Sequence, residues 1–520
     1  MLFEQAKKRF PMWLRLICLF FLLPICLTGQ DQRRIELIRA NSLEFDENIG
    51  KDAQRLIGNV IFKHKGALMY CDSAYLYNAS NSLEAFGSVR VDQGDTLKLF
   101  SDKLLYRGNE EVVLVRNNVT LEDSEMTLTT QTLDYDRNSG RAIFYDQGTI
   151  VSKENDNTLI ACEGVYDSST EFFYFRDSVI LRNPQYLIET DTLHYSNATE
   201  IAYFFGPTFI FNKENTIYCE NGWYDTFNDL AQFKQNAYID NGKQLLKGDS
   251  LWYSGAEGLG KAYLNVSVLD TVDNYEIRGD YGEYDEIKGK NFVTGRAEML
   301  QFDLTDTLYL HGDTLLAIRD SIRGDRVFAF HGVKFFRNDM QGAADSLVYS
   351  PSDSLIQMFV DPILWSEDLQ ITGDTIQIRT FEGTVENLYV FDHAFMVNKL
   401  DSVKYNQIKG KRLTGYFTDN DLRTIIIKGN GQSLYYASEE EESDSTDSTT
   451  TKVSYIGVNK AICSNIQIDM KDRKIDQIYF LKKPDGAFYP LEKFPKNEER
   501  FEGFLWQVER RPQSRDDIFE

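Results

Sequence analysis

Histidine and proline are both scarce in this chain. Only five histidines occur among 520 residues, far apart, with no HExxH or HxH pattern and no Ser, His and Asp in a recognisable local context. We therefore expect no catalytic residues, no metal site and no cofactor. Between Ile35 and Lys483 there are only four prolines, although linkers between domains are usually rich in such breakers. The sequence favours one long regular body over several globular domains.

Long apolar runs are absent after residue 29. The run Leu16–Leu27 follows four basic residues and precedes Thr28 and Gly29, which is the layout of a secretory signal peptide. Its roughly twelve apolar residues are too few for a hydrocarbon core that needs about 20. We predict a signal peptide at 1–29 that is cleaved near Gly29, with an uncleaved N-terminal anchor as the alternative.

Positive charge is also in deficit. The chain has 80 acidic and 56 basic residues and a net charge of −24, which repels phosphate backbones and excludes general nucleic-acid binding.

Cysteine is sparse and unpaired in sequence. Cys18 and Cys26 fall in the predicted signal peptide, and the remaining four form no CxxC-type pair. They are placed alike in a repeated unit, shortly before an apolar position, where a small hydrophobic residue would serve. We therefore predict buried free thiols, with disulfides as the alternative. The four are Cys71, Cys162, Cys219 and Cys463.

What the chain does contain is an internal repeat of about thirty residues. One motif is a polar corner followed by alternation, as in Asp249-Ser-Leu-Trp-Tyr253 and Asp345-Ser-Leu-Val-Tyr349. The other places a turn residue between an aromatic residue and Val-x-apolar, as in Phe86-Gly-Ser-Val-Arg-Val91. The residue after this turn recurs at steps of 29 to 31, with one step of 36. These markers are Val60, Val89, Val119, Thr149, Val179, Thr208, Ala237, Ser267, Ala297, Val333, Ile363 and Ala394.

Each unit alternates apolar and polar residues over five to seven positions, which is typical of half-buried strands. A period of this length indicates a stack in which every unit buries its apolar face against its neighbours. We predict an all-β, elongated stacked-repeat fold over 35–436. An acidic low-complexity loop at 437–452 and a last β unit at 453–481 follow. The tail, 482–520, either docks a partner or caps the end of the stack.

An acidic residue recurs at one register position of the repeat. An Asp at such a strand entrance usually closes a tight turn with its own side chain, and we favour this interpretation. A row of Ca²⁺ sites is the alternative, because hard cations bind carboxylates. The positions are Asp72, Asp102, Asp191, Glu220, Asp249, Asp280, Asp313, Asp345 and Asp374.

A stripe of aromatic and aliphatic residues is predicted to point the same way in every unit. It either packs as a solid core or, if the two sheets open along an edge, lines a groove that shelters acyl chains. The candidate groove residues are Val60, Phe62, Val89, Val91, Val119, Leu121, Val179, Leu181, Phe209, Phe211, Val333 and Phe335.

The repeat from Leu37 to Tyr436 resembles the OstA/LptA family of lipopolysaccharide-transport proteins. The resemblance rests on units such as Asp95-Thr96 to Tyr106 and Phe86 to Val91 behind a signal peptide. It implies a β-jellyroll or β-taco stack in the periplasm of a Gram-negative envelope, either free there or associated with the outer membrane. Lipid A acyl chains would lie between its sheets, and other envelope proteins, or further copies of the chain end to end, would join through strand edges.

Two functions of different classes follow. The first is a lipid-binding protein of outer-membrane biogenesis that helps to carry lipopolysaccharide. The second is a non-enzymatic structural or adhesive scaffold of the cell envelope with a solid core.

Overall fold

The computed structural model of the protein describes residues 34–45, 52–94, 97–124, 126–153, 156–184, 186–213, 215–285, 287–302, 306–320, 324–381, 384–418, 421–441, 452–471 and 474–520. The predicted signal peptide, 1–29, lies outside them, as does the centre of the predicted acidic loop. Within the described ranges, no helix has the length and apolar character needed to span a bilayer.

The chain forms two compact units, one up to Tyr263 and one from Leu264 to Glu520. Strand β17 (Leu259–Asp270) contains the boundary.

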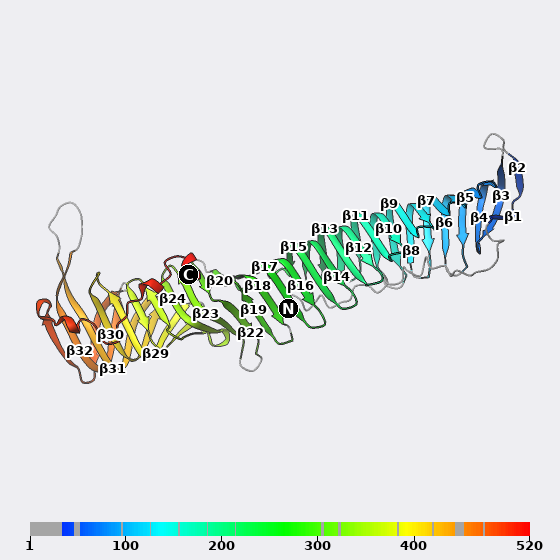
Figure 1. The fold of residues 1–520 in the computed structure, drawn as a ribbon. Coiled ribbons are helices and arrows are strands. Elements are labelled where there is room, and N and C mark those ends of the chain that lie inside the picture. The colour runs from blue at the N-terminus through cyan, green and yellow to red at the C-terminus, as the bar shows by residue number, and fades with distance from the viewer. Residues whose placement is uncertain are drawn as a thin grey trace. The chain divides into compact units, whose positions relative to one another are not determined.

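Unit 1 is an all-β stack in which neighbours in sequence are neighbours in space. From β3 to β16, each strand pairs antiparallel with the next strand of the chain (Figure 1). Strands β1 and β2 both pair with β3. The strands are β1 (Glu36–Arg39), β2 (Ser42–Phe45), β3 (Ala53–His64), β4 (Ala67–Tyr77), β5 (Ser82–Asp92), β6 (Lys98–Arg107), β7 (Val112–Glu122), β8 (Met126–Asp136), β9 (Arg141–Ser152), β10 (Thr158–Asp167), β11 (Phe172–Arg182), β12 (Tyr186–Ser196), β13 (Ile201–Asn212), β14 (Thr216–Asp225), β15 (Leu230–Asp240) and β16 (Gln244–Ser254).

Each long strand bends at a corner near its middle. In β5 the pairing register shifts between Phe86 and Val89, where Gly87 and Ser88 have φ of 71° and 42°. Two successive left-handed residues turn the strand sharply, and Gly, Asn and Asp tolerate that conformation best. The corner divides every strand into two pieces. We call the sheet that contains Ser82–Phe86 half-sheet A and the sheet that contains Val89–Asp92 half-sheet B.

Unit 2 continues the same plan, but several corners break the strand completely. Half-sheet A contains β19, β22, β25 and β28, and half-sheet B contains β20, β21, β26 and β27. The strands are β18 (Tyr275–Asp285), β19 (Lys290–Thr294), β20 (Glu298–Phe302), β21 (Thr307–His311), β22 (Thr314–Ile318), β23 (Arg326–Arg337), β24 (Met340–Ser350), β25 (Leu355–Phe359), β26 (Ile363–Ser366), β27 (Leu369–Thr372), β28 (Thr375–Phe381), β29 (Thr384–Lys399), β30 (Tyr405–Thr418), β31 (Asp421–Glu441), β32 (Lys452–Lys471), β33 (Lys474–Leu481) and β34 (Asp485–Pro490). Short 3-10 turns are η3 (Pro351–Asp353), η4 (Leu491–Lys493), η5 (Lys496–Glu498), η6 (Val508–Arg510) and η7 (Asp516–Phe519).

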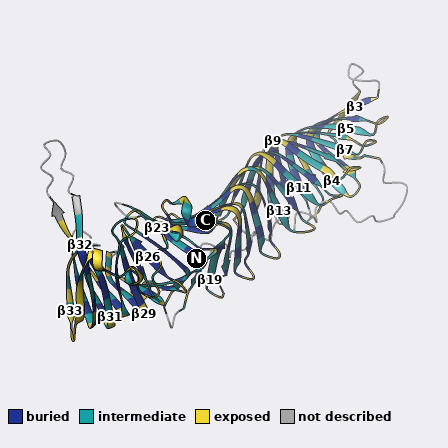
Figure 2. Cartoon of the chain, turned by 60° about the vertical axis from the view of Figure 1, so that its left-hand side comes forward, coloured by how far each residue is buried: buried dark blue, intermediate teal, exposed yellow. Residues whose placement is uncertain are grey.

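The core lies between the two half-sheets of each unit, where buried residues alternate along the strands (Figure 2). In β11, Phe173 and Phe175 before the corner and Val179 and Leu181 after it are all buried, as the two-residue side-chain period of a strand requires. The predicted all-β stacked-repeat fold is confirmed.

Three of the predicted repeat markers are displaced by one residue. The corner pairs are Asp146 with Gln147, Leu264 with Asn265, and Val360 with Asp361. The residues that follow them are Gly148, Val266 and Pro362, which are buried, and not the markers Thr149, Ser267 and Ile363. Ile363 packs with Ala343 and Trp365, apart from the main core.

The structure corrects the cysteine prediction at one position. All four cysteines are free, and Cys71, Cys219 and Cys463 are buried, whereas Cys162 is exposed. Ala161 takes the inward position in β10, so Cys162 falls one residue later, at the place that Asp102 occupies in β6. Cys162 is therefore a corner residue and not a core residue.

The last strands extend into the segments predicted as loop and tail. Strand β31 continues to Glu441 and β32 begins at Lys452, so both extend into the segment 437–452 that was predicted as loop. Strand β33 ends at Leu481, and β34, which lies in the predicted tail, also pairs with β32.

The C-terminal tail turns back along its own unit. After β34, residues 494–520, which we call the strap, follow the outer face of half-sheet B against the chain direction (Figure 1). The strap contacts β32 through Lys460, β30 through Gln407, β27 through Gln370 and β24 through Gln341. In this structure the first part of the tail adds β34 beside β32, and the rest docks on the face of its own unit.

Candidate functional site

The inner face between the half-sheets holds most of the predicted groove residues. Nine of the twelve are buried: Val60, Phe62, Val89, Val119, Leu121, Val179, Leu181, Val333 and Phe335. Val91 is half-buried and pairs with the buried Met69 and Leu99. The first seven and Val91 belong to unit 1, whereas Val333 and Phe335 belong to unit 2.

Phe209 and Phe211 do not share this face. In β13 the inward residue after the corner is Thr208, which is fully buried and pairs with Thr190 as Val179 does. Because side chains alternate, Phe209 and Phe211 point outward. There the Phe209 ring lies 5.8 Å from Phe211 and 4.9 Å from Tyr218, centroid to centroid. The expectation that all twelve point the same way is wrong for these two.

The interior of unit 1 is filled by large side chains near β9–β11. A Cβ at Gly148 would meet the Phe144 ring at 2.4 Å, and one at Gly164 would meet it at 2.2 Å. Phe173 stacks on Tyr166 with ring centroids 4.4 Å apart. At this level, unit 1 has the packed core of a solid stack.

The interior of unit 2 opens in a narrow cleft of about 70 Å³. Its lining comes from the strand ends that lie away from the corners. These are Arg337, Met340, Ser366 and Leu369 on half-sheet B, and residues of β29 to β32 on half-sheet A. Apolar residues dominate the lining, namely Met340, Leu364, Trp365, Leu369, Ile371, Ile378, Val385, Leu388, Phe417, Leu422 and Met470. The sequence did not single out this set, because each member alone reads as a core residue.

The mouth of this cleft carries paired charges. Arg337 Nε lies 2.5 Å from Asp339 Oδ1, and Arg337 Nη2 lies 2.8 Å from Asp339 Oδ2. Arg337 and Asp339 both line the cleft, with Asp421 also at its edge. An apolar interior with a charged rim suits an amphiphile, because its apolar part can be buried while its polar part stays in water.

Three of the recurring acids form hydrogen bonds with side chains at the corners. The Asn118 side-chain amide donates to Asp102 (Nδ2 to Oδ2, 2.7 Å), and Asn236 donates to Glu220 (2.8 Å). In each pair, a left-handed corner residue meets the acid of the preceding strand. In unit 2, His331 Nδ1 lies 3.2 Å from Asp345 Oδ1. Hydrogen bonds from Ser346 and His331 lower the pKa of Asp345.

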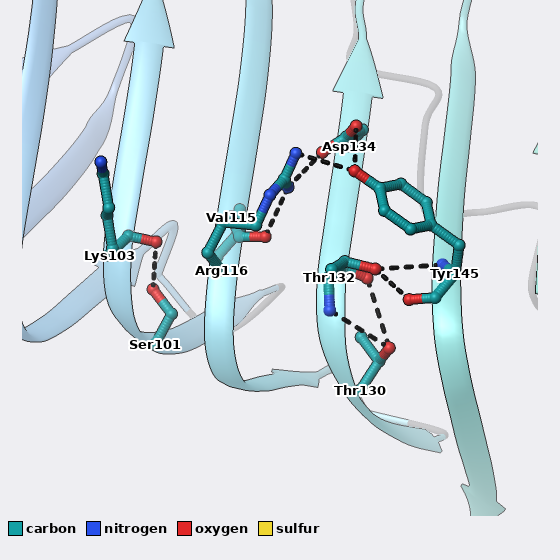
Figure 3. Close-up of polar contacts among 8 residues, drawn as sticks. All are labelled: Ser101, Lys103, Val115, Arg116, Thr130, Thr132, Asp134 and Tyr145. Carbon is teal, nitrogen blue, oxygen red and sulfur yellow. Dashed lines mark hydrogen bonds and ion pairs between the residues drawn. The ribbon is translucent and has the colours of Figure 1, made fainter.

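A polar network on β7–β9 extends this corner chemistry (Figure 3). Arg116 forms an ion pair with Asp134, and Tyr145 Oη donates to Asp134 Oδ2 over 3.2 Å. On the inner side of the corner, the Thr130 hydroxyl donates to the Thr132 carbonyl (3.3 Å), as Ser101 does to Lys103. The two hydroxyl contacts give hydrogen-bond partners to backbone carbonyls beside the bend.

The described histidines and acids form no cluster that could hold a metal ion. Across the described ranges, no group of three or more His, Cys, Asp and Glu side chains is placed to hold a metal ion. His64 Nε2 lies 3.1 Å from Tyr106 Oη in unit 1. His311 Nδ1 lies 2.7 Å from the Ala297 carbonyl in unit 2.

The geometry defines a class of protein: a repeat stack of bent antiparallel strands with an apolar interior between two half-sheets. Residues 32–191 and 187–249 match the family described as OstA-like protein. Over this part of the chain, the match supports the resemblance that the sequence predicted.

Two further comparisons complete this result. No curated protein matches the chain. Among solved structures, the chain is similar to LptH, the LptA homologous periplasmic component of the lipopolysaccharide transport device from Pseudomonas aeruginosa. That similarity covers 21% of this chain and 82% of LptH, with 13% sequence identity and a TM-score of 0.20.

Proposed function

We propose that the protein binds lipopolysaccharide in the periplasm of a Gram-negative bacterium and helps to carry it to the outer membrane, without enzymatic activity. The observation that supports this most directly is the apolar cleft of unit 2, which opens between the strand ends of half-sheets A and B and has charges at its mouth. The OstA-like family match adds to it, through the resemblance of that family's repeats to lipopolysaccharide-transport proteins.

Acyl chains are the part of the ligand that the cleft suits. Burial of each methylene contributes about 0.8 kcal/mol, so several buried methylenes suffice to hold a chain. The cleft of about 70 Å³ is smaller than the roughly 300–1,000 Å³ typical of ligand pockets. Entry of a chain therefore requires the two edges to move apart.

The first strands of unit 1 and the last strands of unit 2 are the proposed contacts for other envelope proteins or for a second copy. In unit 2, β34 pairs with β32, and Tyr479, Leu481 and Phe488 are 40–54% exposed. In unit 1, β2 carries Phe45, which is 70% exposed. Such edges offer unpaired backbone groups to an added strand.

A structural or adhesive envelope scaffold is the second candidate, and a specific observation favours it. The Phe144 ring fills the space between Gly148 and Gly164 in unit 1, which leaves no room there for a ligand.

Photocrosslinking in cells that make lipopolysaccharide separates the two functions. A photoreactive phenylalanine at Leu369 or Leu422 would lie in the cleft, and one at Leu121 would lie inside unit 1. The matched control is Phe211, which points outward. We expect capture of lipopolysaccharide from Leu369 and Leu422 but not from Phe211. Equal capture, or none, at all of these positions would favour the scaffold.

A further inference from the structure

The outer face of half-sheet B in unit 2 has the features of a built binding site for an extended peptide. We propose that the strap is the releasable ligand of this site. We also propose that its docking holds in place the hairpin of β26 and β27, which forms one lip of the cleft. That this lip matters for ligand binding rests on the acyl-chain function proposed above. The docking of the strap on its site does not depend on that function.

Two glutamines bind the backbone of the strap in the same way. Gln407 Nε2 donates to the Glu499 carbonyl over 2.8 Å, and its Oε1 accepts from the Phe501 amide over 2.9 Å. Gln370 repeats this arrangement with the Leu505 carbonyl (2.7 Å) and the Gln507 amide (2.9 Å). Each side chain therefore pairs with residues i and i+2 of the strap, as a neighbouring strand would.

These glutamines occupy a repeated position. Gln341, Gln370 and Gln407 each lie four residues before the corner position held by Asp345, Asp374 and Lys411. Gln341 Oε1 accepts from Arg511 Nε over 2.8 Å. All three are 3% exposed or less. The equivalent position in unit 1 holds other residues, such as Leu245 four before Asp249.

The middle of the strap contacts the hairpin of β26 and β27, which forms a lip of the cleft. Arg511 Nη1 donates to the Glu367 carbonyl over 2.6 Å, at the tip of the hairpin. Trp365 borders the cleft, while its side chain packs with Ala343 and Ile363 and its indole donates to Gln370 Oε1 over 3.2 Å. The Gln370 amide therefore joins a residue of this hairpin to the strap.

Release of this middle section leaves the anchors on both sides in place. Phe494 and Phe501 are buried in a cluster with Phe395, Leu434 and Val458, and Ile518 is buried near the end of the strap. No residue from 505 to 511 is buried. Trp506 is half-buried and packs against the edge of the same cluster, 5.6 Å from the Tyr405 ring. Because this section has less buried apolar surface than its flanks, it can open locally at lower cost than they can.

Hydrogen exchange of the full chain tests the coupling without any lipid. Gln370→Leu removes the amide and keeps the side-chain size, and Gln377→Leu is the matched control on β28, where Gln377 pairs with Gln357 and Tyr389. We expect amides of 505–511 and of 363–372 to exchange at least tenfold faster in Gln370→Leu, and to be unchanged in Gln377→Leu. Faster exchange of the strap alone would overturn the proposal that the strap holds the lip in place. No change in either segment would overturn the proposal that Gln370 holds the strap.

A peptide-binding measurement tests the site itself. Phe501→Asp in the full chain should displace the strap from its anchor. We expect a labelled peptide of residues 494–515 to bind this variant at least tenfold more tightly than the unaltered chain, and the addition of Gln407→Leu to reverse the gain. Equal binding to all three chains would overturn the peptide site. If Phe501→Asp fails to fold, the exchange experiment on Gln370→Leu still decides the proposal.

Failure of the strap and failure of the proposed function give different results. Loss of lipopolysaccharide crosslinking at Leu369 alongside normal exchange coupling would contradict the lipid function and leave the strap proposal standing. The reverse pattern would contradict the strap proposal alone.

Discussion

The aromatic ring of Phe144 occupies the place where a side chain at Gly164 would lie. A Cβ at Gly164 would meet Phe144 Cε1 at 2.2 Å, and Phe144 is 5% exposed. The absence of a side chain on β10 thus lets a large ring on β9 cross the space between the two half-sheets.

Removal of this ring should be costly. We expect Phe144→Ala to lower the free energy of unfolding by about 3–5 kcal/mol, through lost burial and the cavity that remains. The neighbouring Tyr145 is 38% exposed, so Tyr145→Ala is the control and should cost much less. Urea unfolding measures both changes in the free energy of unfolding, provided that the variants have the same m-value as the unaltered chain. A cost below about 1 kcal/mol for Phe144→Ala would mean that the interior of unit 1 is not tightly packed here.

A comparison of Gly87 with Gly94 separates two costs of adding a Cβ, namely backbone strain and crowding by a neighbouring side chain. Their φ angles are +71° and +68°, but a Cβ at Gly87 would meet Asp72 Oδ2 at 2.4 Å, whereas a Cβ at Gly94 would meet nothing within 4 Å. Left-handed backbone alone costs about 1–2 kcal/mol for a residue with a Cβ. We expect Gly94→Ala to destabilise by about that amount and Gly87→Ala by more.

The excess at Gly87 should depend on its neighbour. If crowding by the Asp72 side chain causes it, Gly87→Ala should cost less in an Asp72→Ala background, which a double-mutant cycle measures. An unchanged cost in that background would assign the whole effect to the backbone.

The four cysteines should differ in reactivity. Burial raises the pKa of Cys71 and of Cys219 to about 12 and also raises the pKa of Cys463, so little thiolate forms at neutral pH. Cys162 is exposed. In a folded chain that begins at Gln30, we expect a maleimide to label one cysteine, and Cys162→Ser to abolish the labelling. All four should react in denaturant. Rapid labelling of the folded Cys162→Ser chain would contradict these positions.

The repeat was predictable from sequence because its corners need particular residues. A left-handed pair favours Gly, Asn and Asp, as at Gly87 or Asn117 and Asn118, and these residues recur at the corner step. The alternation around each corner then defines the inner face. The sequence prediction misplaced Phe209 and Phe211 because several aromatic residues follow one another there. The residue type then no longer reveals which face is inward.

The cleft and the strap were not predictable in the same way. A period describes neighbours one unit apart, whereas Gln370 bonds to residues 135 and 137 positions away. The shared register of Gln341, Gln370 and Gln407 is a signal that points to something bound on that face. It does not identify the bound segment, because bonds to backbone groups leave no sequence pattern in the strap.

The charge of Asp401 should contribute to stability in a pH-dependent way. Lys404 donates from Nζ to Asp401 Oδ2 over 2.8 Å, and the Val403 amide donates to Oδ1 over 2.8 Å. The hydrogen bond from Lys404, followed by those from the backbone, lowers the pKa of Asp401 to about 2 from 3.8. Because the folded pKa lies below the unfolded one, the stabilisation is complete above about pH 4. It is lost as the pH falls from there through about 2.

Asp401→Asn keeps an acceptor for the backbone amides and removes the charge. The side chain is 35% exposed, so solvent screening should limit the effect to about half a kcal/mol or less. We expect the difference in unfolding free energy between wild type and Asp401→Asn to be constant from pH 7 to 5 and to shrink between pH 4 and 3. In a Lys404→Met background the difference should be smaller at every pH. A difference that stays constant down to pH 3 would show that the charge is not its cause.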